Sequence, residues 1–85
     1  MKHHIILRSK AKTLSPILRI GKLGLSDNMV NEINNALKKK KLIKIKLLPT
    51  SLEGANKKEF IESIIQKTNS ELIGSVGNVI VLYKS

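Results

Sequence analysis

The 85-residue sequence contains no cysteine and no tryptophan, and its aromatic content is only 2%, namely Phe60 and Tyr83. Without cysteine, disulfides and thiolate metal sites are excluded. So few rings argue against a platform on which unpaired bases stack. No apolar run is long enough to span a bilayer, and Ile5-Ile6-Leu7 is too short for the core of a signal peptide. We therefore expect a soluble, cytoplasmic protein.

Acidic residues are also scarce. The sequence has 6 Asp and Glu against 16 Lys and Arg, which gives a formal net charge of +10. A nucleic-acid partner is the natural explanation, because each cation placed on a phosphate releases condensed counterions. Compositional bias and an anionic membrane surface are the alternatives. We expect residues 1–85 to form a single domain, with residues 1–4 disordered.

The first half of the chain predicts two helices and two strands. Apolar spacing indicates a helix over Ile6–Leu14, which Pro16 ends, followed by a strand over Pro16–Ile20. Ser26 is the predicted N-cap of a second helix, which closes in the lysine run 38–41. Alternation over Leu42–Leu48 predicts a strand with one buried face, and two lysines lie on its other face, namely Lys44 and Lys46.

The second half predicts a helix and a hairpin. Asn56, with Glu59 three residues later, resembles a capping box, and Asn69 is the expected end of that helix. Gly77-Asn78 between two apolar runs is a hairpin signal. Strands alternating with helices imply parallel pairing. The predicted fold is a single compact α/β (α+β) domain, in the order α-β-α-β-α-β-β, with a mixed four-stranded sheet and helices packed against it.

The turn Gly21-Lys22-Leu23-Gly24 is the sharpest local motif. It joins a predicted strand to a helix N-terminus, where backbone N–H groups and the positive end of the helix dipole favour an anion. The glycines would let the main chain approach a phosphate, and Lys22 adds a charge at the tip. The alternative is a tight turn that needs positive φ at two places and binds nothing.

Other basic residues offer weaker signals. Lys44 and Lys46 could contact phosphates or form an ordinary solvated strand face, and the lysine run 38–41 is usually a solubilising helix end. His3 and His4 lack a partner at metal-ligand spacing. No P-loop, dinucleotide motif or nucleophile arrangement is present. We therefore expect no enzyme activity, no cofactor and no metal.

The run LRSKAKTLSPILRIGKLGLSDNMVNEINNAL, the strand LIKIKLL and the closing VGNVIVLYKS resemble the CRM domain, the family of YhbY-like proteins. The resemblance extends from about Ile6 to Lys84. It implies a fold similar to the C-terminal domain of bacterial translation initiation factor three. It also implies RNA binding through the GxxG turn and nearby basic residues, in ribosome maturation or intron splicing. By position, the implied residues are Gly21, Lys22, Leu23, Gly24, Arg8, Lys10, Lys12, Lys44 and Lys84.

Two places depart from the family pattern. Members often carry a basic residue after the hairpin glycine, where this chain has Asn78. The segment from Thr50 to Ala55 also matches loosely. The leading hypothesis is a monomeric binder of ribosomal RNA or its precursor, acting in large-subunit assembly, with Lys46 added to the residues above. A protein-interaction module of a ribonucleoprotein, with incidental charge, is the alternative, and a double-stranded DNA binder is another.

Overall fold

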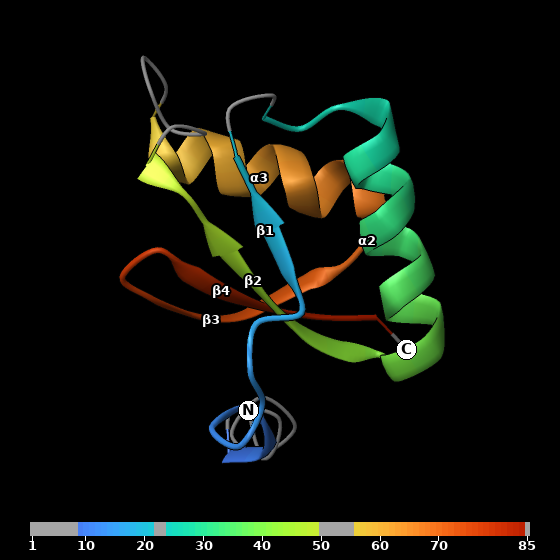
Figure 1. Cartoon of the computed structure of the whole chain (residues 1–85), viewed down its shortest axis with the longest axis vertical. Coiled ribbons are helices and arrows are strands. Elements are labelled where there is room, and N and C mark those ends of the chain that lie inside the picture. Colours follow the sequence, from blue (N-terminus) through green and yellow to red (C-terminus); the bar gives the residue numbers. More distant parts are fainter. Residues whose placement is uncertain (1–8, 22–23, 50–55, 85) are drawn as a thin grey trace.

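The segments in which apolar and polar residues alternate are strands of one four-stranded sheet. The computed structural model describes residues 9–21, 24–49 and 56–84. The elements are β1 Leu18–Ile20, α2 Asp27–Lys40, β2 Leu42–Leu47, α3 Lys57–Thr68, β3 Glu71–Val76 and β4 Val79–Tyr83. The predicted α+β domain with a mixed four-stranded sheet is confirmed, and Figure 1 shows the arrangement.

The strands lie in the order β1-β2-β4-β3. β1 pairs parallel to β2, with Leu18 opposite Ile45, and β4 pairs antiparallel to both β2 and β3. Parallel pairing was therefore the wrong expectation for β2 and β3, because β4 lies between them. β3 still runs in the same direction as β2, since both are antiparallel to β4. The hairpin thus returns its second strand to the middle of the sheet.

One face of the sheet is covered by α2 and α3, as Figure 1 shows. Apolar residues from every second strand position meet the buried faces of the two helices there. Isoleucine and leucine dominate this core, so the branched side chains supply both strand propensity and packing volume. The buried core residues are Ile20, Ile33, Leu37, Ile43, Ile45, Leu47, Ile61, Ile64, Ile80 and Leu82.

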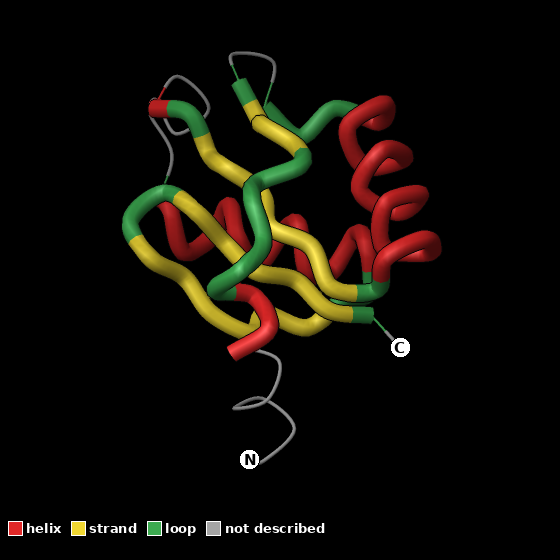
Figure 2. The backbone as a smooth tube through the Cα atoms, turned by 60° about the horizontal axis from the view of Figure 1, so that its bottom comes forward, coloured by secondary structure: helices red, strands yellow, loops and turns green. Residues whose placement is uncertain are grey.

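A short helical segment, residues 9–11, contacts the opposite face. Ala11 is buried there against Ile73 and Val81. Figure 2 shows this segment in front of the strands, with α3 behind them. Ala11 and its two buried contacts form a small second cluster, with Leu42 and Tyr83 partly buried beside it. The open face is therefore covered over only part of its area.

Side chains cap the N-termini of both long helices as predicted. Ser26 Oγ accepts a hydrogen bond from Met29 N at 3.2 Å, and Asn56 Oδ1 accepts one from Lys58 N at 2.8 Å. Each bond satisfies an amide that has no partner within its own helix. Asn69 ends α3 in the left-handed conformation, at φ 52°. The predicted start of α2 and both predicted ends of α3 are confirmed.

The first helix ends earlier than its periodicity predicts. Residues 12–13 form a turn, and Leu14 is 37% exposed instead of lying on a buried helical face. Leu14 N bonds to Ala11 O at 3.0 Å, and Thr13 Oγ1 bonds to Lys10 O at 2.9 Å, so three-residue turns replace the helical ladder. The strand begins at Leu18 and not at Pro16, although Ile17 N already donates to Lys44 O. Over the described ranges, no helix is long and apolar enough to cross a membrane.

Candidate nucleic-acid interface

The GxxG turn follows the edge strand β1 and precedes α2. Gly24 N donates to Gly21 O at 2.9 Å, which closes the turn across its two glycines. Ser26 then caps α2, so the helix N-terminus lies directly behind the turn. Lys22 and Leu23, the predicted contact residues at the tip, lie outside the described residues. The described glycines thus place a closed turn at a helix N-terminus, the local geometry that favours an anion.

The two glycines are not equivalent. Gly24 has φ +64°, in the left-handed region, and a Cβ there would have nothing within 4 Å. The φ of Gly21 is not positive, and a Cβ there would lie 3.5 Å from Leu48 Cδ1, an ordinary contact. The idea that both positions need positive φ is therefore wrong. Turn geometry explains glycine at position 24 and leaves glycine at position 21 without a conformational reason.

The open face of the sheet carries three neighbouring cations. Lys44 and Lys46 lie on β2, on the side opposite its buried Ile45, as predicted. The parallel register places Arg19 of β1 directly beside Lys46, and both side chains are exposed. Sequence reasoning missed Arg19. The signal that could have found it is the same alternation, since Arg19 stands between the apolar Leu18 and Ile20.

A groove of about 580 Å³ lies on the same face. The first-helix region and the strands line it together. Its wall includes Lys12 and Lys44, and its floor is mostly aliphatic, with Ala11, Val79 and Val81. Val76, at the hairpin, also lines the groove and is 82% exposed. The fold therefore combines cations and open apolar surface on one side of the sheet.

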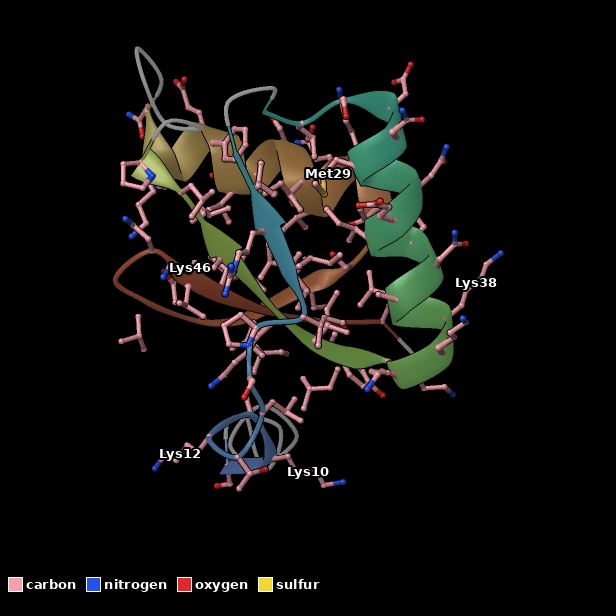
Figure 3. The ribbon with its side chains drawn as sticks, viewed as in Figure 1. Lys10, Lys12, Met29, Lys38 and Lys46 are labelled. Atoms are coloured by element: carbon pink, nitrogen blue, oxygen red, sulfur yellow. The ribbon has the colours of Figure 1, made fainter. Side chains whose placement is uncertain are left out.

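Lys10 and Lys12 lie at the other end of β1 from the turn. Both side chains are exposed, and Figure 3 shows them projecting from the N-terminal segment below the sheet. Lys46 lies over the sheet, between that segment and the turn. Arg8 lies outside the described residues. Among the described residues, Lys10, Lys12, Lys44 and Lys46 therefore extend along the sheet and do not form one compact cluster.

Lys84 is separate from this face. Its backbone N–H donates to Lys41 O at 2.9 Å, which ties the end of β4 to the end of α2. Lys84 lines a cavity between α2 and α3, together with Lys38 and Lys67. Figure 3 shows Lys38 on the outer side of α2, away from Lys46. The fold thus does not bring Lys84 together with Lys44 and Lys46.

The described residues form no group of side chains that could bind a metal ion. Within residues 9–21, 24–49 and 56–84, no three His, Cys, Asp or Glu side chains gather where a metal ion could bind. The described lining of the groove contains no carboxylate. The arrangement offers ammonium and guanidinium groups over a partly apolar surface, which suits attraction of a polyanion.

Comparison with known proteins identifies the family. The model of the CRS1/YhbY (CRM) domain matches residues 2–84. The chain belongs to this family. The CRM resemblance recognised in the GxxG turn and the flanking strands is thereby confirmed over nearly the whole chain.

Relatives of this CRM domain have names that refer to RNA. The chain is 41% identical over 83 residues to the probable RNA-binding protein YqeI of Bacillus subtilis, covering 98% of this chain and 84% of that protein. It is 34% identical to a probable RNA-binding protein of Methanocaldococcus jannaschii, covering 93% of this chain and 58% of that protein. An RNA-binding protein of Haemophilus influenzae is 31% identical, with 98% of this chain and 82% of that protein covered.

A solved structure shares the fold. The solution structure of a hypothetical Staphylococcus aureus protein, described as a candidate RNA-binding protein, superimposes with a TM-score of 0.80. It is 37% identical, and the match covers 99% of this chain and 85% of that one. The fold described above is therefore shared with that protein.

Proposed function

We propose that this CRM domain is a non-catalytic RNA-binding protein that contacts the phosphate backbone of structured RNA. The observation that carries the proposal is the row of cations on the open sheet face, where Arg19, Lys44 and Lys46 are neighbours. The other face of the same strands packs against α2 and α3 in the core, so these three side chains lie on the face that the two helices leave open. The names of three relatives also refer to RNA binding.

The proposed contact surface extends from the turn to the N-terminal segment. Gly21, Lys22, Leu23 and Gly24 would hold one phosphate at the N-terminus of α2, where the helix dipole favours negative charge. The cations of the sheet face would follow the backbone onward. Arg8, Lys10 and Lys12 would meet it at the far end. Such contacts position RNA without reading its sequence, so the domain should recognise shape more than bases.

The proposed ligand is ribosomal RNA or its precursor, bound during maturation of the large subunit. The family resemblance supports this choice, because CRM domains act in ribosome maturation and intron splicing. The net charge of +10 suits a partner with dense phosphates. Each phosphate contact should contribute about 0.7–0.9 to the slope of log affinity against log salt.

A protein-interaction module is the second candidate. The aliphatic floor of the groove and the exposed Val76 favour it, since open apolar surface often marks a protein contact. The two candidates differ in what a charge reversal beside the groove would do. A charge reversal should strongly lower the affinity for RNA. It should change the affinity for a protein partner little, if that partner binds through the aliphatic groups.

Two matched charge reversals test the proposal. Lys46→Glu and Lys58→Glu both replace an exposed lysine, but Lys58 lies on α3, behind the sheet. We expect Lys46→Glu to weaken binding to a labelled ribosomal-precursor fragment about tenfold and to flatten its salt dependence. Lys58→Glu should bind as the wild type does. Equal affinities for both variants, with circular dichroism showing intact folding, would remove the sheet face from the proposal.

A further inference from the structure

A polar cavity of about 490 Å³ lies between α2, α3 and the end of β4. α2 contributes Asn31, Asn34, Asn35 and Lys38 on one side, at the spacing of a single helical face. Lys67 of α3 and Lys84 after β4 line the other side. This cavity is separate from the groove on the open face, since the two have no lining residue in common.

The composition of this cavity points to a polar, negatively charged ligand. Three lysines line it, and its described lining contains neither a carboxylate nor an aliphatic or aromatic side chain. α2 packs in the core through Ile33 and Leu37, whereas Asn31 and Asn35 are exposed, so the asparagines present amide groups to solvent beside the helix packing. Nothing in the described lining neutralises the three ammonium groups.

Asn34 adds an unsatisfied hydrogen-bonding group. It is half-buried, and its Oδ1 is fully buried without a hydrogen-bond donor from the described part of the chain. Thr68, beside the same cavity, contrasts with it, because its Oγ1 bonds to Ile64 O at 2.7 Å and lies 2.8 Å from Ser70 Oγ. A buried polar group without a partner is costly. Because Oδ1 is buried, a ligand in the cavity would meet it only after the Asn34 side chain turns outward, and the missing hydrogen bond lowers the cost of that rotation.

We infer that this cavity is a second RNA contact, which takes an unpaired nucleotide. The asparagine amides would meet the edge of the base, and an adenine fits best, since an Asn amide can pair with its N6 donor and its N7 acceptor. The lysines would meet the phosphate. An unpaired nucleotide combines both chemistries, whereas a free phosphate would leave Asn34 Oδ1 without a donor.

The second contact rests on the proposed RNA-binding function and deepens it. α2 begins directly after the GxxG turn, and its C-terminal half lines the cavity. Its 14 residues span about 21 Å at 1.5 Å per residue. A single strand leaving the turn along α2 could reach the cavity within a few nucleotides. This path also gives Lys38 and Lys84 a place in RNA binding that the open face does not offer.

The side-chain amide resonances of asparagine provide a direct test. The ¹⁵N-labelled protein is titrated with a hexa-adenylate RNA, a hexa-uridylate RNA and inorganic phosphate. We expect the hexa-adenylate to shift the amide resonances of Asn31, Asn34 and Asn35 at the lowest concentration. Inorganic phosphate that produced the same shifts at the same concentration would overturn the inference, because the base would then contribute nothing.

Asn34→Leu separates a binding role from a structural one. Leucine removes the unsatisfied amide at similar size, so the melting temperature should be no lower than that of the wild type. Affinity for the hexa-adenylate should fall about tenfold. Lys67→Gln should also weaken it severalfold, while its control on the same helix, Lys58→Gln, should not. Wild-type affinity in both Asn34→Leu and Lys67→Gln would disprove the site.

Comparison with the sheet-face variant separates the two proposals. If Lys46→Glu loses affinity for the precursor fragment while both cavity variants keep theirs, the second contact is wrong and the proposed function stands. If the wild type itself does not bind the precursor fragment, the proposed function fails. Loss of affinity in both sets supports a strand that contacts both places.

Discussion

The two faces of β2 perform different tasks within six residues. Ile43, Ile45 and Leu47 are at most 1% exposed and pack under α2 and α3. Lys44 and Lys46 alternate with them and lie on the face that the two long helices do not cover. Because side chains on a strand alternate between the faces, one short segment contributes to both the core and the proposed interface.

This comparison explains why stability and binding should separate cleanly by residue. Core positions lose packing when they are truncated, whereas exposed lysines contribute little to folding and more to attraction of a polyanion. The separation also extends to β1, where Ile20 is fully buried and Arg19 is exposed beside Lys46. Of two adjacent residues in one strand, substitution of the buried one should therefore lower stability, and substitution of the exposed one should weaken RNA binding.

Truncation on the covered face should have the largest effect. Ile45 is 0% exposed in the centre of the sheet, between β1 and β4. We expect Ile45→Ala to lower the free energy of unfolding by about 2–5 kcal/mol, as lost transfer energy plus a cavity. Urea denaturation followed by circular dichroism measures this change. A loss below about 1 kcal/mol would mean that the core collapses around the site more easily than its close packing suggests.

Neutralising the open face should affect RNA and not folding. We expect Arg19→Gln to weaken binding to the precursor fragment about fivefold to tenfold and to lower the salt slope by about one phosphate contact. Its unfolding free energy should stay within about 0.5 kcal/mol of the wild type, since Arg19 is exposed. Fluorescence titration at several salt concentrations measures the slope. A slope equal to that of the wild type would place Arg19 outside the interface.

The alternation of apolar and polar residues predicted the two faces of β2, but it did not predict the order of the strands in the sheet. The pattern of Ile43 and Lys44 depends only on local periodicity, which the sequence displays directly. The neighbour of β2 depends on where the hairpin returns, a long-range choice, so the rule of parallel pairing held for β1 and β2 but not for β2 and β3. Arg19 stands in a strand that was predicted, but its place beside Lys46 depends on the register of β1 on β2, which is also a long-range choice.

The first helix shows the same limit. Leu7, Ala11 and Leu14 have helical spacing, yet the chain turns at residues 12–13 and exposes Leu14. The turn satisfies backbone groups locally through Thr13 and leads the chain toward β1, which periodicity cannot anticipate. The polar cavity was equally hidden, since it joins α2 to Lys67 and Lys84, which are distant in sequence. Helix caps and the buried faces of single elements depend on nearby residues and can be predicted from the sequence. A site between elements depends on tertiary packing and cannot be predicted in this way.

Substitution of Gly24 in the GxxG turn should lower stability less than truncation of the core does, and only through the backbone conformation. Gly24 has φ +64° with open space around its Cβ position, so Gly24→Ala should cost about 1–2 kcal/mol in unfolding free energy through backbone strain alone. Gly77→Ala is a matched control, because Gly77 has φ +59° and equally open surroundings. Thermal denaturation should show similar losses for both. A much smaller loss for Gly24→Ala would indicate that the turn rearranges without cost.

Gly21 should show the smallest effect on stability. Its φ is not positive, and a Cβ would only touch Leu48 Cδ1 at 3.5 Å, so Gly21→Ala should change the unfolding free energy by less than about 0.5 kcal/mol. RNA affinity should nevertheless fall severalfold, because an added methyl group would keep a phosphate from approaching the main chain. Parallel measurement of melting temperature and RNA affinity tests this. Unchanged affinity would leave the glycine at position 21 unexplained by either folding or binding, and would shift the phosphate contact of the turn to the side chain of Lys22.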